Sequence, residues 1–143
     1  MRAALTLAAG AIATGDVPVG AVVVAPDGTI VGEGRNEREA HGDPTAHAEV
    51  RALQAAASAL GRWRLDDCTL VVTLEPCLMC AGAALAARIP RIVLGAWDDK
   101  AGATGSQWDV VRDARIGSKV EVVSGVLADE SAQLLRDFFE ARR

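Results

Sequence analysis

The sequence predicts an α/β fold of three layers (α/β/α), with helices on both faces of a central five-stranded mixed sheet. Five short apolar segments have the length of strands, and after the second one they alternate with helix-like stretches. Two strands joined by a tight turn pair antiparallel, whereas strands joined through a helix become parallel neighbours. Both kinds of connection occur along this chain, so the sheet is expected to be mixed.

The N-terminal part is predicted to hold a helix and a hairpin. The helix should end at Gly15, because glycine readily adopts the left-handed conformation that ends helices. Residues 17–25 have the pattern of a buried strand, residues 26–28 form a Pro-Asp-Gly turn, and residues 29–35 form the second strand. A polar loop is expected over 36–42. The apolar face of the helix should consist of Leu5, Ala8, Ala9 and Ile12.

Two helices with a strand between them are expected in the middle of the chain. The first helix begins with Asp43 as its cap, or alternatively with Thr45, and ends near residue 60. The strand covers residues 69–74. The second helix lies between two prolines, over residues 76–90.

The C-terminal part is predicted to add two strands and two helices. Residues 91–95 and 119–124 have the apolar pattern of strands. Residues 106–109 resemble a capping box and are expected to start a short helix. The final helix covers 129–141, and its apolar stripe consists of Leu134, Leu135 and Phe138.

Composition limits the classes of protein that this chain can be. Its 143 residues suit one domain spanning 1–143, and half of them are hydrophobic, which argues against disorder. Aromatic residues are scarce, so the core must consist mainly of Ala, Val, Leu and Ile. The net charge of −4 creates no overall basic field, so a nucleic acid would have to meet a local basic patch, either on one subunit or assembled across subunits.

Cysteine usage and hydropathy indicate the compartment. Three cysteines do not form a disulfide framework, and reduced thiols or metal-bound thiolates suit a cytoplasmic protein. The apolar N-terminus is interrupted by Thr6, Gly10 and Thr14, which favours a helix over a signal peptide. No uninterrupted apolar run is long enough to span a membrane.

Two segments carry the residue types of a zinc site, and each opens a predicted helix. Cys77 and Cys80 are three residues apart and therefore share one helical face, a spacing that suits one tetrahedral zinc ion. His47 is the expected third ligand. Three protein ligands leave a fourth position for water, as catalytic zinc sites require.

Glu49 follows His47 by two residues and is the expected proton carrier. Residues two apart on a helix do not share a face, so the zinc ion must lie beyond the end of the helix, where both side chains can reach it. From there Glu49 can take a proton from zinc-activated water and hand it to a leaving amine. The combination of His-x-Glu with Pro-Cys-x-x-Cys is the signature of zinc-dependent deaminases.

Other interpretations of the same residues remain open. The two cysteines of the second segment could be core thiols or a redox pair. A structural zinc would be closed by a fourth protein ligand, for which His41 and Cys68 are the candidates. That arrangement would make the chain a non-catalytic zinc-binding domain, in which Glu49 has no chemical role.

Over nearly its whole length the chain resembles the bacterial tRNA adenosine deaminases, members of the cytidine/deoxycytidylate deaminase superfamily. The resemblance rests on VPVGAVVV at 17–24, DPTAHAE at 43–49, TLEPCLMCAGA at 73–83, GAWDDKAGATGS at 95–106, and GVLADE and DFFEARR near the C-terminus. It implies a cytidine deaminase-like fold, a Zn2+ cofactor, and hydrolytic conversion of the wobble adenosine of a tRNA anticodon to inosine. It also implies a cytoplasmic homodimer that binds the anticodon stem-loop.

The resemblance further implies roles for individual residues. Asn36 contacts the base, Val17 forms part of the wall around the flipped base, Asp98 lies beside the substrate strand, and Phe138 borders the same cleft. In the dimer, a basic patch is expected from Arg88, Arg91, Arg112, Arg115 and Lys119. The zinc segments are shared with deaminases of free bases and nucleosides, so a guanine or cytosine deaminase remains the alternative function.

Overall fold

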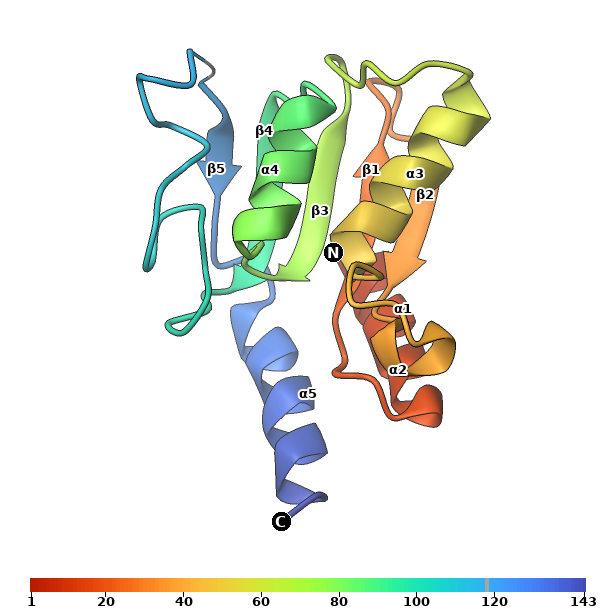
Figure 1. The fold of residues 1–143 in the computed structure, drawn as a ribbon. Coiled ribbons are helices and arrows are strands. Elements are labelled where there is room, and N and C mark those ends of the chain that lie inside the picture. The colour runs from red at the N-terminus through yellow and green to blue at the C-terminus, as the bar shows by residue number, and fades with distance from the viewer. Residues whose placement is uncertain (118) are drawn as a thin grey trace.

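A five-stranded sheet lies at the centre of the fold, in a computed structural model that describes residues 1–117 and 119–143 (Figure 1). The strand order is β2-β1-β3-β4-β5. The strands are β1 (Gly20–Val24), β2 (Ile30–Arg35), β3 (Thr69–Leu74), β4 (Arg91–Ala96) and β5 (Glu121–Val123).

The sheet is mixed, as the sequence predicts. Strand β1 pairs antiparallel with β2 through the hairpin and antiparallel with β3 on its other side. Strands β3, β4 and β5 run parallel to one another. The parallel pairs follow from connections that cross over the sheet, of which the first contains a helix.

Helices cover both faces of the sheet. Figure 1 shows α3 and α4 side by side on one face, and α1 and α5 contact the strands from the other. The three-layer prediction is therefore confirmed. The helices are α1 (Arg2–Ala11), the 3-10 turn η1 (Ile12–Thr14), α2 (Arg38–His41), α3 (Ala48–Leu60), α4 (Leu78–Ala86) and α5 (Ala128–Glu140).

Close packing holds α3 against the sheet. Gly32 and Gly34 of β2 face this helix, and a Cβ atom on either would lie 2.6 Å from a backbone nitrogen of α3. On the helix side the buried contact residues are alanines, Ala48, Ala52 and Ala56. Small residues on both surfaces bring the backbones together, so the position of α3 is set by main-chain contact.

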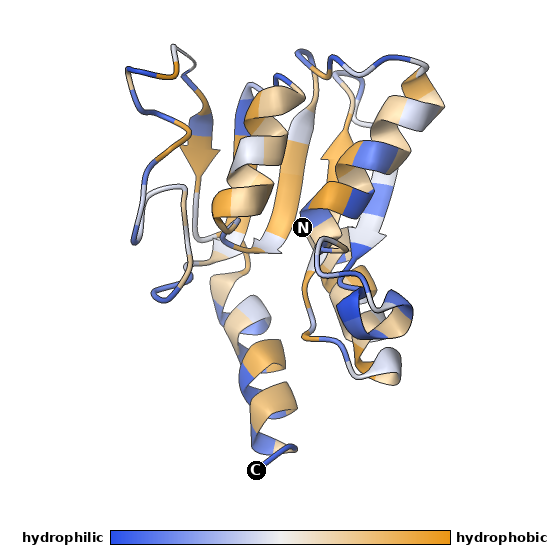
Figure 2. Cartoon of the chain, viewed as in Figure 1, coloured by the Kyte–Doolittle hydropathy of each residue, from blue (hydrophilic) through white to orange (hydrophobic). Residues whose placement is uncertain are grey.

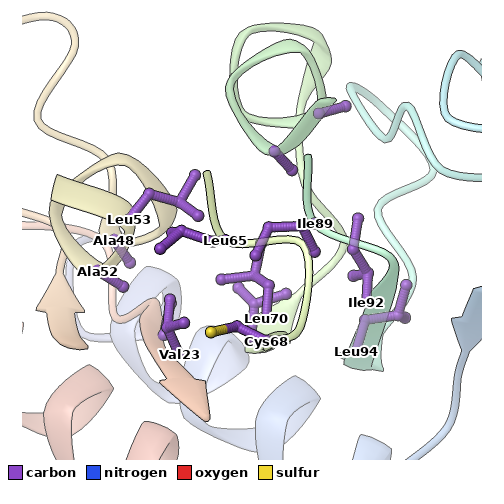
Figure 3. Close-up of a cluster of buried hydrophobic side chains, with 14 of the residues drawn as sticks. Val23, Ala48, Ala52, Leu53, Leu65, Cys68, Leu70, Ile89, Ile92 and Leu94 are labelled. Atoms are coloured by element: carbon purple, nitrogen blue, oxygen red, sulfur yellow. The ribbon is translucent and has the colours of Figure 1, made fainter. Parts of the chain in front are cut away.

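Aliphatic side chains fill the space between the sheet and the helices. Figure 2 shows hydrophobic residues concentrated along the central strands, and Figure 3 shows one cluster that runs from Leu53, Leu65 and Val23 through Leu70 to Ile92 and Leu94. Among the described residues, Phe138 is the one buried aromatic side chain. The expected aliphatic core is confirmed. No helix in the described ranges combines the length and apolar character needed to cross a bilayer.

The predicted apolar face of the first helix is wrong in part. Its buried residues are Ala4, Ala8 and Ala11, while Ile12 is 40% exposed. The reason is Gly20 on β1: a Cβ atom there would lie 2.6 Å from the Ala8 nitrogen, so only small residues fit at the helix–sheet contact. Larger side chains are displaced from that contact.

Several element boundaries also differ from the prediction. The first strand begins at Gly20 instead of residue 17, and the expected loop over 36–42 contains the short helix α2. Helix α3 begins after His47, because the carboxylate of Asp43 accepts the N–H of Thr45 and closes a separate turn before the helix. This later start makes His47 the cap of α3.

The helix expected over 106–109 does not form. Thr104 and Asp109 instead make a bridge, and the N–H of Ser106 donates to the buried carboxylate of Glu75 at 3.1 Å. An acceptor from a distant part of the chain has replaced the local capping interaction.

Candidate active site

The three expected zinc ligands come from two helix N-termini. His47 is the cap residue of α3 and has an extended backbone, with ψ of 153°. Cys77 is the cap residue of α4, and Cys80 lies in the first turn of the same helix. Figure 1 shows that both helices begin at the same end of the sheet, where β3 ends. The fold therefore brings together residues thirty positions apart.

The geometry of these side chains fits a tetrahedral zinc ion. The Nδ1 atom of His47 lies 3.6 Å from Sγ of Cys77 and 3.5 Å from Sγ of Cys80, and the three ligand atoms lie within 4.8 Å of one another. Ordinary Zn–N and Zn–S bonds at tetrahedral angles separate nitrogen and sulfur by about 3.6 Å. The donor atoms are thus spaced as the metal requires, and the predicted zinc site is confirmed.

The protonation of the thiols also suits metal binding. A hydrogen bond from the Cys80 thiol lowers the pKa of Cys77 to about 4, and the same bond raises the pKa of Cys80. The hydrogen bond to Cys77 in turn raises the pKa of His47. One ligand is therefore already a thiolate before the metal arrives, and the other sulfur must release its proton to bind zinc.

Glu49 lies in the first turn of α3 and is 4% exposed. Burial raises its pKa to about 7, and the negative charge of Cys77 acts in the same direction. The positive charge of a zinc ion would oppose this shift. Because His47 precedes the helix and has an extended backbone, it escapes the helical geometry that would turn the two side chains apart.

Three of the expected substrate residues line one cavity of about 250 Å3. They are Asn36, Val17 and Phe138, together with Asp16 and Arg142 among others. The cavity lies between the start of β1, the end of β2 and helix α5. The structure therefore brings these three positions together across the fold.

Asn36 connects that cavity to the zinc site. Its side-chain oxygen accepts the N–H of Ala48 at 3.1 Å, and its amide nitrogen donates to the carbonyl oxygen of Val17 at 3.0 Å. Ala48 lies between His47 and Glu49. The Asn36 side chain thus fixes the start of α3, and the second N–H of its amide is used by neither bond.

Asp98 lies in the loop that follows β4 and is half-buried. Its carboxylate accepts the backbone N–H groups of Lys100 at 3.0 Å and Ala101 at 3.2 Å, which closes a turn. The backbone of the same loop meets the zinc segment, because Gly102 forms a bridge with Cys77.

The two other candidate ligands lie elsewhere. His41 is exposed and pairs with Glu37 at 3.5 Å. Cys68 is buried in the core (Figure 3), and burial raises the pKa of its thiol to about 11. Within the described residues, the group of possible metal ligands holds three members, not four. An open coordination position fits catalysis and argues against a closed structural site.

Sequence reasoning missed one buried acidic residue beside the metal site. Glu75 ends the segment TLVVTLE and is 2% exposed. Its buried carboxylate accepts hydrogen bonds from the backbone of the loop after β4. A lone carboxylate at the end of an apolar strand, two residues before a metal ligand, is the signal that could have revealed it.

The expected basic patch is largely neutralised within the chain. Arg91 pairs with Glu121, Arg112 with Asp109, and Arg115 with Asp113. The remaining two members, Arg88 and Lys119, line a cavity that also includes Asp66.

Known proteins resemble this chain over its full length. The family model of the cytidine and deoxycytidylate deaminase zinc-binding region matches residues 1–96. The tRNA-specific adenosine deaminase of Haemophilus influenzae is 51% identical over 143 residues, which cover 100% of this chain and 83% of that protein. A tRNA(Ile)-lysidine synthase of Deinococcus radiodurans is 55% identical over 144 residues, covering 100% of this chain but 25% of that protein.

A solved structure agrees with the sequence comparisons. It comes from biochemical and structural studies of A-to-I editing by tRNA:A34 deaminases at the wobble position of transfer RNA. Its TM-score to this chain is 0.90 at 41% identity, covering 94% of this chain and 97% of that chain. With its three-ligand zinc site and five-stranded sheet, this chain belongs to the cytidine and deoxycytidylate deaminase family and, within it, to the tRNA-specific adenosine deaminases.

Proposed function

We propose that this chain is a zinc-dependent hydrolase that converts adenosine to inosine at the wobble position of a tRNA anticodon. The observation that carries the proposal is the triangle of His47, Cys77 and Cys80 beside the buried carboxyl group of Glu49. The similarity to tRNA-specific adenosine deaminases over the whole chain supports RNA as the source of the adenosine.

The reaction adds water at C6 of adenine and releases ammonia. Zinc held by the three ligands supplies Lewis acidity, which makes water nucleophilic at neutral pH. Glu49 takes the proton that the attacking water loses and gives it to the departing amine nitrogen. Its burial suits this role, because desolvation raises the pKa of the carboxyl group and favours accepting a proton, while the charge of a bound zinc ion would favour releasing it.

The cavity that Asn36 connects to the start of α3 is the proposed place for the flipped base. A base must leave its stack to reach the reacting atoms, and it can be held by contacts along its edges and faces. Asn36, Val17 and Phe138 line this cavity, and we assign to them the contacts with the nucleotide. To Asp98, in the loop that follows β4, we assign a contact with the substrate strand next to the flipped base.

We further propose that residues 1–143 act as one deaminase domain within a cytoplasmic homodimer. The dimer is proposed on electrostatic grounds: the net charge is −4, and Arg91, Arg112 and Arg115 already pair with carboxylates of their own chain. A tRNA anticodon stem-loop therefore needs basic groups from more than one face or subunit.

Glu49→Gln tests the mechanism, because it keeps the shape of the side chain while removing its ability to carry a proton. Zinc content should stay at one ion per chain, while turnover of an anticodon stem-loop falls by about 10²- to 10⁴-fold. Inosine formation and zinc content are measured on the same preparation. Near-normal activity in the zinc-loaded variant would remove Glu49 from the proposed mechanism.

The alternative function, deamination of a free guanine or cytosine, shares the same zinc chemistry. It predicts turnover of free bases and little dependence on salt, whereas binding to RNA weakens steeply as salt rises.

A further inference from the structure

The carboxylate of Glu75 is buried and is held by backbone N–H groups. Its Oε2 atom accepts the N–H of Asp98 at 2.9 Å, and its Oε1 atom accepts the N–H groups of Thr104 at 3.0 Å and Ser106 at 3.1 Å. No ion pair with Glu75 occurs within the described ranges. A carboxylate without a counter-ion is costly to bury, so three amide donors that offset this cost are a specific arrangement.

The loop over 98–106 is wrapped around this carboxylate. The Ser106 hydroxyl donates to the Asp98 carbonyl oxygen at 2.8 Å, and the N–H of Gly102 donates to the same oxygen at 3.0 Å. A Cβ atom on Gly102 would collide with Oε2 of Glu75, so the backbone of the loop lies directly against the carboxylate. The carboxylate therefore forms the centre of the loop.

The zinc segment is bonded to the end of β4 at Glu75 and to the same loop at the two residues that follow Glu75. The N–H of Glu75 donates to the Ala96 carbonyl oxygen at 2.8 Å, and the N–H of Ala103 donates to the Pro76 carbonyl oxygen at 2.9 Å. Cys77 and Gly102 form an antiparallel bridge. One short segment thus carries a metal ligand through Cys77 and the loop through Glu75.

We propose that Glu75 is a positioning residue that fixes the loop over 98–106, and with it Asp98, at a set place relative to the zinc ligand Cys77. This inference rests on the proposed function, since it assigns the loop to substrate recognition. Within the described residues, the hydrogen bonds of the Glu75 carboxylate all go to the loop and none to a zinc-ligand side chain, so Glu75 acts through the loop. Its loss should weaken substrate binding more than it slows the chemical step.

Glu75→Gln removes one of the two acceptor oxygens and places an NH2 group against a backbone donor. At least one buried N–H loses its partner, which costs enough to open the loop. We expect KM for an anticodon stem-loop to rise by about tenfold, with a much smaller change in kcat and with one zinc ion retained per chain. Hydrogen exchange should accelerate in the loop and remain unchanged in α3 and α4.

Two further variants sharpen the test. Asp27→Asn changes an exposed carboxylate in the turn between β1 and β2, outside the loop over 98–106, and should leave KM and the exchange of that loop unchanged. Gly102→Ala places a methyl group against the Glu75 carboxylate from the loop side and should also raise KM. In a Glu75→Ala background, the same Gly102→Ala change should cost less, because the Glu75 carboxylate is gone and the remaining close atom is the Ser106 hydroxyl oxygen, which can rotate away.

The outcomes separate this inference from the proposed function. Unchanged loop exchange and KM in both Glu75→Gln and Gly102→Ala would overturn the positioning role. Loss of zinc or accelerated exchange throughout the chain would also overturn it, by showing that Glu75 supports the fold as a whole. A wild-type protein inactive on the stem-loop would refute the proposed function, while exchange and zinc content would still decide whether Glu75 holds the loop.

Discussion

From the contact between β2 and the start of α3, we expect that a methyl group added on β2 will weaken zinc binding, although its nearest atoms belong to none of the zinc ligands. The perturbation is Gly34→Ala. A Cβ atom at Gly34 would lie 2.6 Å from the Ala52 nitrogen and closer still to the Ala48 carbonyl oxygen. These are backbone atoms that cannot rotate away, so the first turn of α3 must move by about 1 Å to restore ordinary contact.

That displacement reaches the metal site directly. Ala48 lies between His47 and Glu49, so a shift at Ala48 moves a zinc ligand and the proposed proton carrier together. Zinc sites tolerate deviations of only about 0.2 Å in their bond lengths. We therefore expect zinc affinity to fall by about 10- to 100-fold, the range seen when groups that orient metal ligands are changed. Overpacking should also cost about 1–3 kcal/mol of the free energy of unfolding.

Gly32→Ala is the matched control on the same strand. A Cβ atom there would also lie 2.6 Å from a backbone nitrogen of α3, that of Ala56, one turn farther from the metal site. Urea unfolding of the zinc-free proteins measures stability, and competition with a chromophoric chelator measures zinc affinity. Both variants should lose similar stability, whereas Gly34→Ala should lose much more zinc affinity. Equal zinc affinities for the two variants would refute the reasoning.

Three further predictions concern the ligands and the fold. At pH 7, zinc binding to the metal-free protein should release about one proton or more, because the pKa of the Cys80 thiol is raised and the thiol must ionise to bind. Calorimetry in two buffers of different ionisation enthalpy measures this release. For the same reason, zinc affinity should fall as the pH falls. Cys77→Ser should lower zinc content by native mass spectrometry, and unchanged content would remove it from the ligand set. Although burial opposes the ionisation of Asp16, hydrogen bonds led by the N–H of Glu39 lower the pKa of its carboxyl group. The stability that ionised Asp16 contributes is therefore present above the pKa of the unfolded state and is lost as the pH falls through the folded-state pKa. In the Asp16→Asn variant, the free energy of unfolding should fall less steeply between pH 5 and pH 3.

The arrangement of the sheet and the zinc ligands could be predicted from the sequence because local patterns specify them. The strand predicted over 69–74 has the same bounds as β3. A strand that is buried on both faces is a continuous apolar run, so it can be identified from its own sequence. Cys77 and Cys80 share a helical face by spacing alone. The expected resemblance to a deaminase family was also confirmed, because the motifs extend over nearly the whole chain.

Other features could not be predicted because contacts between distant residues decide them. The buried face of α1 depends on Gly20, which lies on a different element. The failure of the helix over 106–109 depends on Glu75, about thirty residues earlier. The same carboxylate organises the loop beside the site, and no local pattern in that loop indicates the acceptor. The roles of Asn36 and Asp98 toward substrate stay predictions.

The central claim is that this chain deaminates the wobble adenosine of a tRNA, and inosine formation by the zinc-loaded protein tests it most directly. The substrates are an anticodon stem-loop with a wobble adenosine, the same stem-loop with that adenosine moved one position, and free adenine, guanine, cytosine and their nucleosides. We expect inosine at the wobble position of the first substrate alone. Turnover of a free base or nucleoside, with none in the stem-loop, would contradict it.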